Sequence, residues 1–475
     1  MRHPRSNLIA TQLSQLVCLS SAFALGTDAF GGTVTACGDT GAGSLRNVVA
    51  AAASAENINV SACSTITLTS GEIASSLSRL RITGNAASPT VITASNLSRV
   101  INHTGTGGYL LLRDVTIQNG KLTAPTALGG CIYSTAPSVQ LDGATVKNCA
   151  ATETSAGGFA RGGGIFALHA IDLRNSTVTG NTATQQSANY FKAGGGGIYA
   201  ESLTAFNSTI AYNGTKSSGG GKTNQYTVGG GLLTTAAAKI YSSTIASNYS
   251  GKYGGMRLAS GGTGSVKILN STISSNYAIL KCGGISVGAA AFVLGNSTVT
   301  LNQSFGSGGA AGVLTNGGIT LQSSIIANNS VLNGPESDLS VGTTIDAASA
   351  NNLIMTSNIA TPADTIQADP KLLPLADNGG RSLTHALRQD SPALNRGNNI
   401  LEYGNFTPVT CDQRGNPSKP QSNPPNTDNC SDVNGGFLRV DADPLHSHAD
   451  IGAYEEQLPN VDWIFYDGFE GDYLQ

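Results

Sequence analysis

Charge, aromatic side chains and long apolar runs are all scarce in this sequence. Charged residues make up 12% of the 475 positions and aromatic residues 6%, with a single Trp and three Met. Beyond the N-terminal segment, no stretch reaches the roughly 18 consecutive apolar residues that mark a candidate transmembrane helix. We therefore expect no transmembrane segment in the mature chain.

Glycine, by contrast, is abundant: the chain has 60 glycines, and apolar residues make up 40% of it. A Gly-rich chain with little charge is disordered when its apolar residues are too few to form a core. Here the apolar residues recur in an ordered pattern, which favours a repetitive β-structure.

The N-terminal segment 1–24 has the features of a secretory signal peptide. It has a basic start at Arg2, His3 and Arg5, a short apolar run over 13–25, and a small-x-small cleavage site at 22–24. Cleavage removes Cys18 and leaves seven of the eight cysteines. Because export permits disulfides, we expect three bridges and one small buried cysteine: Cys37–Cys63, Cys131–Cys149, Cys411–Cys430, and the remaining Cys282.

One motif recurs along the middle of the chain. It is an apolar residue, two small polar residues, Thr and then Val or Ile, with an Asn four residues after the Thr. Six copies are clear and two earlier ones are degenerate, with anchors at Thr116, Thr145, Thr177, Thr209, Thr244, Thr272, Thr298 and Ser324. The steps between anchors are 29, 32, 32, 35, 28, 26 and 26 residues, which indicates a repeat architecture.

A second motif falls between the anchors, where two or three glycines precede an aliphatic residue, as in Gly162-Gly-Gly-Ile165 and Gly195-Gly-Gly-Ile198. Each period therefore holds three short strands. We predict an all-β fold, a right-handed parallel β-helix, that is, a three-sided β-solenoid with an irregular C-terminal cap region. The recurring Asn, from Asn181 to Asn328, would form a ladder of side-chain amides across one corner.

Both motifs resemble the GGA-I and F-x-x-N repeats of polymorphic outer membrane proteins, a surface family with a β-helix fold. The resemblance covers roughly 105–335. The segment Gly38 to Arg46 is similar to the CSLREA-type start of bacterial β-helix proteins. The run from Asp369-Pro-Lys-Leu-Leu-Pro through Asp450-Ile-Gly-Ala-Tyr-Glu455 is similar to the choice-of-anchor Q region of exported bacterial proteins.

These resemblances and the repeats give the expected organisation of the chain. It comprises a signal peptide (1–24), an N-terminal cap with the first coils (25–104), the repeats (105–335), a choice-of-anchor Q-like region (336–460) and a C-terminal tail (461–475). The implied location is the outside or outer surface of a bacterial cell.

Two sets of surface residues are candidate binding sites. The residue after the aliphatic position should point outward, which would expose an aromatic ladder of Tyr133, Phe166 and Tyr199, in steps of 33 residues. A second set follows the Asn ladder, and we expect it to form one basic and aromatic strip: Tyr249, Tyr277, Lys216, Lys252 and Lys281. The net charge of 161–281 is about +8, although that of the whole chain is −3, so the strip suits an anionic partner.

No catalytic or metal-binding constellation stands out, so the catalytic residues are unknown. The acidic residues of the repeats occupy different offsets and do not stack into the carboxyl pair of a glycoside hydrolase. An elimination with Lys or Arg as base remains open. Asp-rich loops near the C-terminus leave Ca²⁺ as a possible ligand, but their spacing is not that of an EF-hand, and we expect no cofactor.

We therefore predict an exported, adhesin-like β-helix protein that acts by binding carbohydrate or another host or cell-surface ligand. Acidic polysaccharide is the preferred ligand, and no nucleic acid partner is expected for an exported chain. One alternative is a polysaccharide lyase or another carbohydrate-active enzyme, and the other is a structural or envelope role without a small ligand.

Overall fold

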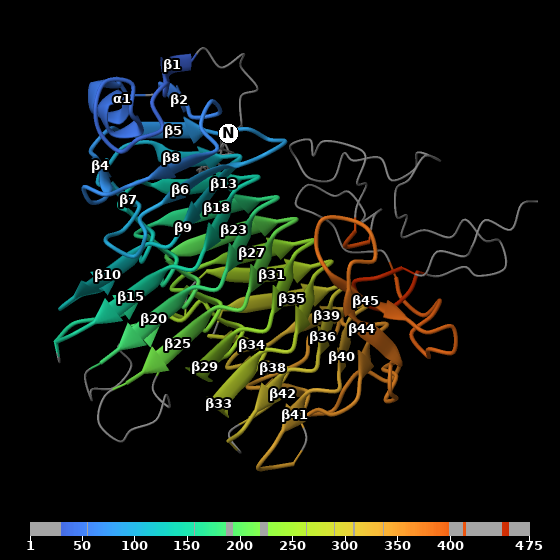
Figure 1. Ribbon diagram of the computed structural model, residues 1–475. Coiled ribbons are helices and arrows are strands. Elements are labelled where there is room, and N and C mark those ends of the chain that lie inside the picture. The colour runs from blue at the N-terminus through green and yellow to red at the C-terminus, as the bar shows by residue number, and fades with distance from the viewer. Residues whose placement is uncertain are drawn as a thin grey trace, which may run out of the picture.

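The computed structural model describes residues 30–54, 56–155, 157–186, 193–218, 227–262, 264–288, 290–306, 309–335, 337–398, 412–414 and 449–455. The chain forms a parallel β-solenoid of about 10 turns with almost no helix (Figure 1). This confirms the predicted fold class. The expected signal peptide, the tail 461–475 and the bridge Cys411–Cys430 lie outside the described residues. No helix among the described residues is long and apolar enough to cross a bilayer.

Three parallel sheets, named C, A and B in the order in which each turn visits them, enclose the core. Sheet C consists of β4 (Ile73–Ser75), β7 (Ile101–His103), β12 (Ile132–Ser134), β17 (Ile165–Ala167), β22 (Ile198–Ala200), β26 (Leu232–Thr234), β30 (Met256–Leu258), β34 (Ile285–Val287), β38 (Val313–Thr315) and β42 (Leu339–Val341). The glycine motif leads directly into these strands.

Sheet A consists of β1 (Phe30–Thr33), β2 (Asn57–Asn59), β5 (Arg79–Thr83), β8 (Tyr109–Arg113), β13 (Ser138–Asp142), β18 (Ala170–Arg174), β23 (Ser202–Phe206), β27 (Ala238–Tyr241), β31 (Ser265–Leu269), β35 (Ala291–Gly295) and β39 (Thr320–Gln322). Sheet B consists of β3 (Thr65–Thr67), β6 (Thr90–Thr93), β9 (Val115–Gln118), β14 (Thr145–Lys147), β19 (Thr177–Thr179), β24 (Thr209–Ala211), β28 (Thr244–Ala246), β32 (Thr272–Ser274), β36 (Thr298–Thr300), β40 (Ile325–Ala327) and β43 (Leu353–Ile354).

A fourth sheet, D, projects from the corner between sheets B and C and forms a flange, seen at the left of Figure 1. Its outgoing strands are β10 (Lys121–Ala124), β15 (Ala150–Glu153), β20 (Thr182–Gln185), β25 (Gly214–Ser217), β29 (Tyr249–Lys252), β33 (Tyr277–Lys281), β37 (Gln303–Ser304) and β41 (Ser330–Val331). Three short strands return towards sheet C: β11 (Ala127–Leu128), β16 (Ala160–Arg161) and β21 (Ala193–Gly194).

The core is a column of aliphatic side chains, because alternate residues of every strand point inward. Ile210, Ile245 and Ile273 are register partners in sheet B and are at most 1% exposed. The Thr anchors before them also pair in register from Thr177 to Thr298. The stacking predicted from the repeat motif is therefore confirmed for these five coils.

The last coil differs from the prediction by one residue. Thr298 pairs with Ile325, not with Ser324, and the Asn ladder continues through Asn329, not Asn328. The reason is that Ser324 does not occupy the Thr position of its coil. It continues a second ladder, formed by the serines that directly precede each Thr anchor, because its hydroxyl accepts the backbone N–H of Ser297, 3.3 Å away.

The Asn ladder runs through the buried residues Asn181, Asn213, Asn248, Asn276, Asn302 and Asn329. In each step the side-chain Nδ2 donates to the Oδ1 of the next coil, at 2.9 to 3.1 Å. The ladder ends on Asp338, whose carboxylate accepts both the backbone N–H and the Nδ2 of Asn329. In these six coils the buried amide of the ladder is thus hydrogen-bonded.

The two disulfides expected within the described residues are present: Cys37–Cys63 and Cys131–Cys149, with S–S distances of 2.05 and 2.08 Å. The second bridge sits in the Asn ladder: the backbone N–H of Cys149 donates to Oδ1 of Asn181. Cys131 precedes Ile132 as Gly164 precedes Ile165. The bridge therefore replaces an Asn–Gly contact in this coil. Cys282 is free and buried, as expected.

A small cap closes the N-terminal end of the solenoid around helix α1 (Leu45–Ala51), which begins at the N-cap Ser44. Arg46 forms an ion pair with Asp39, 2.8 Å away. Asp39 also accepts the backbone N–H of Thr69 and of Ser70. Burial raises the pKa of Asp39, but these hydrogen bonds outweigh it and lower the pKa to about 2.

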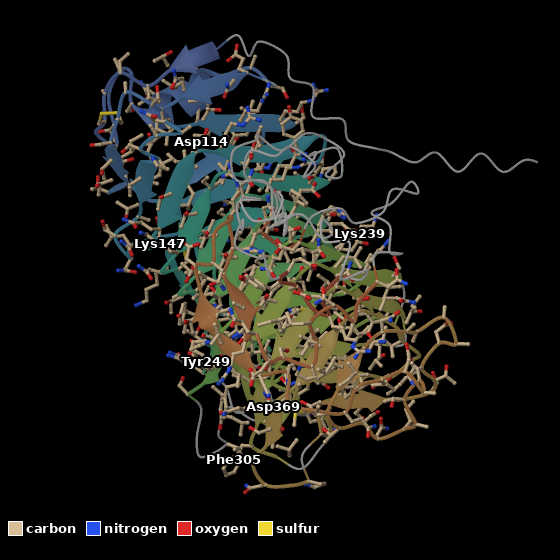
Figure 2. All side chains as sticks on the ribbon, turned by 90° about the vertical axis from the view of Figure 1, so that its right-hand side faces the viewer. Asp114, Lys147, Lys239, Tyr249, Phe305 and Asp369 are labelled. Carbon is tan, nitrogen blue, oxygen red and sulfur yellow. A yellow bond between two sulfur atoms is a disulfide. The ribbon has the colours of Figure 1, made fainter. Side chains whose placement is uncertain are left out.

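The C-terminal part packs against the outer face of sheet B rather than extending the stack. It contains the antiparallel pair β44 (Leu372–Ala376) and β45 (Thr384–Leu387), and it crosses the later coils in Figure 2, where Asp369 is labelled. Gln413 contacts two stacked anchors: its Nε2 donates to Thr244, and Thr272 donates to its Oε1. We call the described residues of this C-terminal part, 369–398, 412–414 and 449–455, the cover.

Candidate binding groove

The flange and the outer surface of sheet C together line a hollow, with Arg161 and Gly194 on one side and Tyr199 and Leu233 on the other. We call the line along the solenoid where these two surfaces meet the groove. Ala160, Ala183 and Ala193 pack together inside the flange. Because side chains alternate along a strand, the neighbours of Ala160 and Ala193, namely Arg161 and Gly194, face away from the flange interior. They face the outer surface of sheet C, as the contact of Arg161 with Tyr199 shows.

One row of residues in register forms the wall of this groove. Its members come from the return strands in the early coils and from the ends of β29 and β33 in the later ones. The wall row is Leu128, Arg161, Gly194, Val228, Lys252 and Lys281.

The outward residues of sheet C form the floor, again in register from coil to coil. The floor row is Asn102, Tyr133, Phe166, Tyr199, Leu233, Arg257, Ser286, Leu314 and Ser340. Neither row contains a carboxylate, whereas the wall contributes three cationic side chains and the floor one. The two rows therefore contribute a net positive charge to the groove.

The structure brings the predicted aromatic ladder together at the start of the floor. The rings of Tyr133, Phe166 and Tyr199 stack with centroids 5.5 and 5.3 Å apart. Their faces, however, are covered: Phe166 is only 5% exposed. Arg99 lies over the Tyr133 ring and Arg161 over the Tyr199 ring. The ladder thus offers ring edges to a ligand and serves mainly to hold two guanidinium groups.

The predicted basic strip is divided between the two sides of the flange. Tyr249 pairs with Tyr277 and lies over Gly214 on the outgoing sheet, at the edge of the view in Figure 2. Lys216 lies with its Nζ 5.6 Å from the centroid of the Tyr249 ring. Lys252 instead pairs with Val228 of the wall row, and Lys281 with Lys252. Only the two lysines of this last pair belong to the groove.

One lysine of the wall is affected by the other. Burial and the neighbouring charge of Lys281 both lower the pKa of the Lys252 ammonium. An ammonium held beside a like charge is stabilised by any anion that lies between them. This end of the groove therefore favours a negatively charged ligand.

Two residues that the sequence did not single out complete the groove. Arg161 and Arg257 both line a pocket of about 210 Å³ at the junction of wall and floor. Neither residue is part of a repeated motif. The wall row has a different residue type in almost every coil, and the floor row changes from aromatic to other residues before Arg257. The only available signal was the placement of Arg257 next to the aliphatic position of the glycine motif, the same position as the ladder aromatics.

Neither the structure nor the comparisons with known proteins add support for a metal site or for membership of a family. Among the described residues, no group of three or more His, Cys, Asp or Glu could hold a metal ion. The Asp-rich loops considered for Ca²⁺ lie between 428 and 443, outside the described residues. No family model, curated protein or solved structure matches the chain. The resemblances found in the sequence therefore remain predictions beyond the solenoid fold itself.

Proposed function

We propose that the protein binds acidic polysaccharide lengthwise in the groove between the flange and sheet C. The observation that carries this proposal is the wall row, which places Arg161, Lys252 and Lys281 in one register, with the uncharged Gly194 and Val228 between Arg161 and Lys252. The floor beside it adds Arg257. Adjacent coils are about 4.8 Å apart, so the four steps from Arg161 to Lys281 span about 19 Å. That length suits an extended chain of several sugar residues.

The proposal places this binding in an exported bacterial protein, acting in an adhesin-like way at the cell surface or outside it. The signal-like segment 1–24 and the two disulfides support export, because disulfides persist in oxidising compartments. A regular solenoid also suits a surface role, because it extends one continuous surface over many coils.

A second candidate, a polysaccharide lyase, is favoured by one observation. The lowered pKa of Lys252 makes its amine a better proton acceptor near neutral pH than an ordinary lysine. An elimination would need such a base beside the sugar ring, and Lys252 stands on the groove wall. This candidate differs from pure binding in that it predicts a product.

Binding to polygalacturonate, dextran sulfate and neutral dextran, measured at low and high ionic strength, tests the proposal. We expect the two acidic polymers to bind, more tightly at low salt, and dextran not to bind. Lys252→Ala combined with Lys281→Ala should weaken binding, and the loss should be largest at low salt, where screening is weakest.

The matched control is Lys147→Ala combined with Lys239→Ala, which removes the same charge from sheets B and A. The control should bind like the native protein. Equal losses in both pairs, or no binding of either acidic polymer, would refute the groove. The same solutions are examined for unsaturated sugar products by ultraviolet absorbance, and product formation that is lost with Lys252→Ala would favour the lyase.

A further inference from the structure

The pocket at the junction of wall and floor differs from the rest of the groove, because apolar and cationic groups meet in it. Arg161, Gly194 and Val228 line it from the wall, and Tyr199, Leu233 and Arg257 from the floor. We propose that this pocket binds a single acidic sugar residue and selects it by its anionic group, a carboxylate or a sulfate ester. This inference rests on the proposed function and specifies which part of the chain is recognised.

Arg161 is held in place before any ligand arrives. Its guanidinium carbon lies 4.2 Å from the centroid of the Phe159 ring and 4.8 Å from that of the Tyr199 ring. Tyr199 is in turn backed by Phe166 and Tyr133 through the aromatic ladder. A guanidinium that lies against rings by its face keeps its N–H groups, which lie in its plane, free to donate to an anion.

Arg257 is held in a similar way from the other side. Its guanidinium carbon lies 4.9 Å from the centroid of the Tyr253 ring, and its Nη1 donates to the hydroxyl of Ser286, 2.8 Å away. Within the described part of the chain, no carboxylate forms an ion pair with Arg161 or Arg257. Two ordered cations that share a pocket repel each other, and an anion bound between them offsets this electrostatic repulsion.

The apolar groups indicate that the anion belongs to a sugar. Val228 and Leu233 place aliphatic side chains beside the two guanidinium groups. A sugar ring offers C–H groups to such surfaces while its acidic substituent reaches the cations, whereas a small inorganic anion would leave them unused. Gly194 also leaves room for a sugar ring, because it has no side chain between Arg161 and Val228. A Cβ at this position would lie 3.1 Å from Leu233.

The test uses substitutions that keep the charge but change its shape. Arg161→Lys and Arg257→Lys each retain a cation and lose the planar fork that binds a carboxylate or sulfate with two hydrogen bonds. Arg79→Lys, on the exposed face of sheet A, is the matched control. Affinities for polygalacturonate and dextran sulfate are measured by calorimetry at low and high salt, and melting temperatures confirm folding.

We expect each pocket variant to lose at least about tenfold in affinity, equivalent to about 1.4 kcal/mol, at both salt concentrations, and Arg79→Lys to bind normally. A loss confined to polygalacturonate identifies the carboxylate, a loss confined to dextran sulfate identifies the sulfate ester, and a loss on both shows that either acid enters. If the native protein binds and both pocket variants bind equally well, the pocket is not selective and only this inference fails. If the native protein binds neither polymer, the proposed function fails first.

Discussion

Gly231 leaves the space that the side chain of Asn248 occupies further along the same turn. A Cβ on Gly231 would lie 2.8 Å from Cγ of Asn248 and 2.6 Å from the carbonyl oxygen of Gly255. The same relationship recurs between the last glycine of each glycine motif and one Asn of the ladder, for example between Gly197 and Asn213 at 2.9 Å. The two sequence motifs are thus parts of one packing arrangement.

Gly231→Ala should therefore destabilise the solenoid, although alanine is small. Its methyl group would meet both a buried amide and a backbone carbonyl, and overpacking of this kind costs about 1 to 3 kcal/mol. Urea unfolding measures the loss. Gly262→Ala is unsuitable as a control because Gly262 has a positive φ. Gly38→Ala, with nothing within 4 Å of its added Cβ, should leave stability nearly unchanged.

The last coil offers a direct test of register. Asn329 is 3% exposed, and its Nδ2 donates to carbonyls of Val299 and Ala327 as well as to Asp338. Asn329→Ala would leave buried partners unsatisfied, at about 1 to 3 kcal/mol each. Asn328 is exposed and has a positive φ, so Asn328→Gly should change stability by less than about 0.5 kcal/mol. A larger effect at Asn328 than at Asn329 in chemical unfolding would reverse the assignment.

The core column should be costly to truncate at any coil. Ile245 is fully buried between Ile210 and Ile273. Ile245→Ala should lower the free energy of unfolding by about 2 to 5 kcal/mol, because the lost methyl groups leave a cavity. Ala variants at Ile210 and Ile273 should show similar losses by calorimetric melting. Unchanged melting temperatures at two of the three sites would contradict the inward orientation.

The cover should loosen in acid because of His385. Its Nε2 pairs with the hydroxyl of Ser274 on sheet B, at 2.8 Å, and its Nδ1 with the carbonyl of Leu373, at 2.7 Å. Burial lowers the pKa of His385 below 6.5 in the folded state, more than the bond to Leu373 raises it. The unfolded chain therefore binds the proton first, and the stability contributed by neutral His385 is present above pH 6.5 and declines as the pH falls below it.

His385→Gln isolates this effect, because Gln does not titrate. Between about pH 8 and about pH 5 the native protein should lose more stability than the variant, measured by hydrogen exchange over 369–398. His103, whose pKa burial also lowers, is present in both proteins and cancels in the comparison. Identical pH profiles would show that His385 does not couple the cover to pH.

The sequence was sufficient for the stack but not for the groove. The Thr and Asn positions repeat in type and spacing, because each must fit the same position in every coil, so their rows were predictable. The wall row changes from Arg161 to Gly194, Val228 and Lys252. Only the parallel pairing of neighbouring coils places these residues side by side, since the intervening loops differ in length and hide the register.

The aromatic ladder shows a different limit. The steps of 33 residues located Tyr133, Phe166 and Tyr199 correctly on neighbouring strands. Whether their faces were open depended on Arg99 and Arg161, which come from other segments of the turn and carry no repeat.

The cover was expected to follow the solenoid as a cap region. Its contact with Thr244 joins residues 139 positions apart in sequence, through the carbonyl of Leu383, and no local pattern reveals such a contact.

The most direct test of the groove is a crystal structure of the protein with an acidic oligosaccharide, because two surfaces compete for the ligand. The account predicts sugar residues between the wall row and sheet C, with an acidic group hydrogen-bonded to Arg161 and Arg257. Sugar bound instead on the outer face of the flange, against Tyr249 and Tyr277, would contradict it and restore the strip expected from the sequence alone.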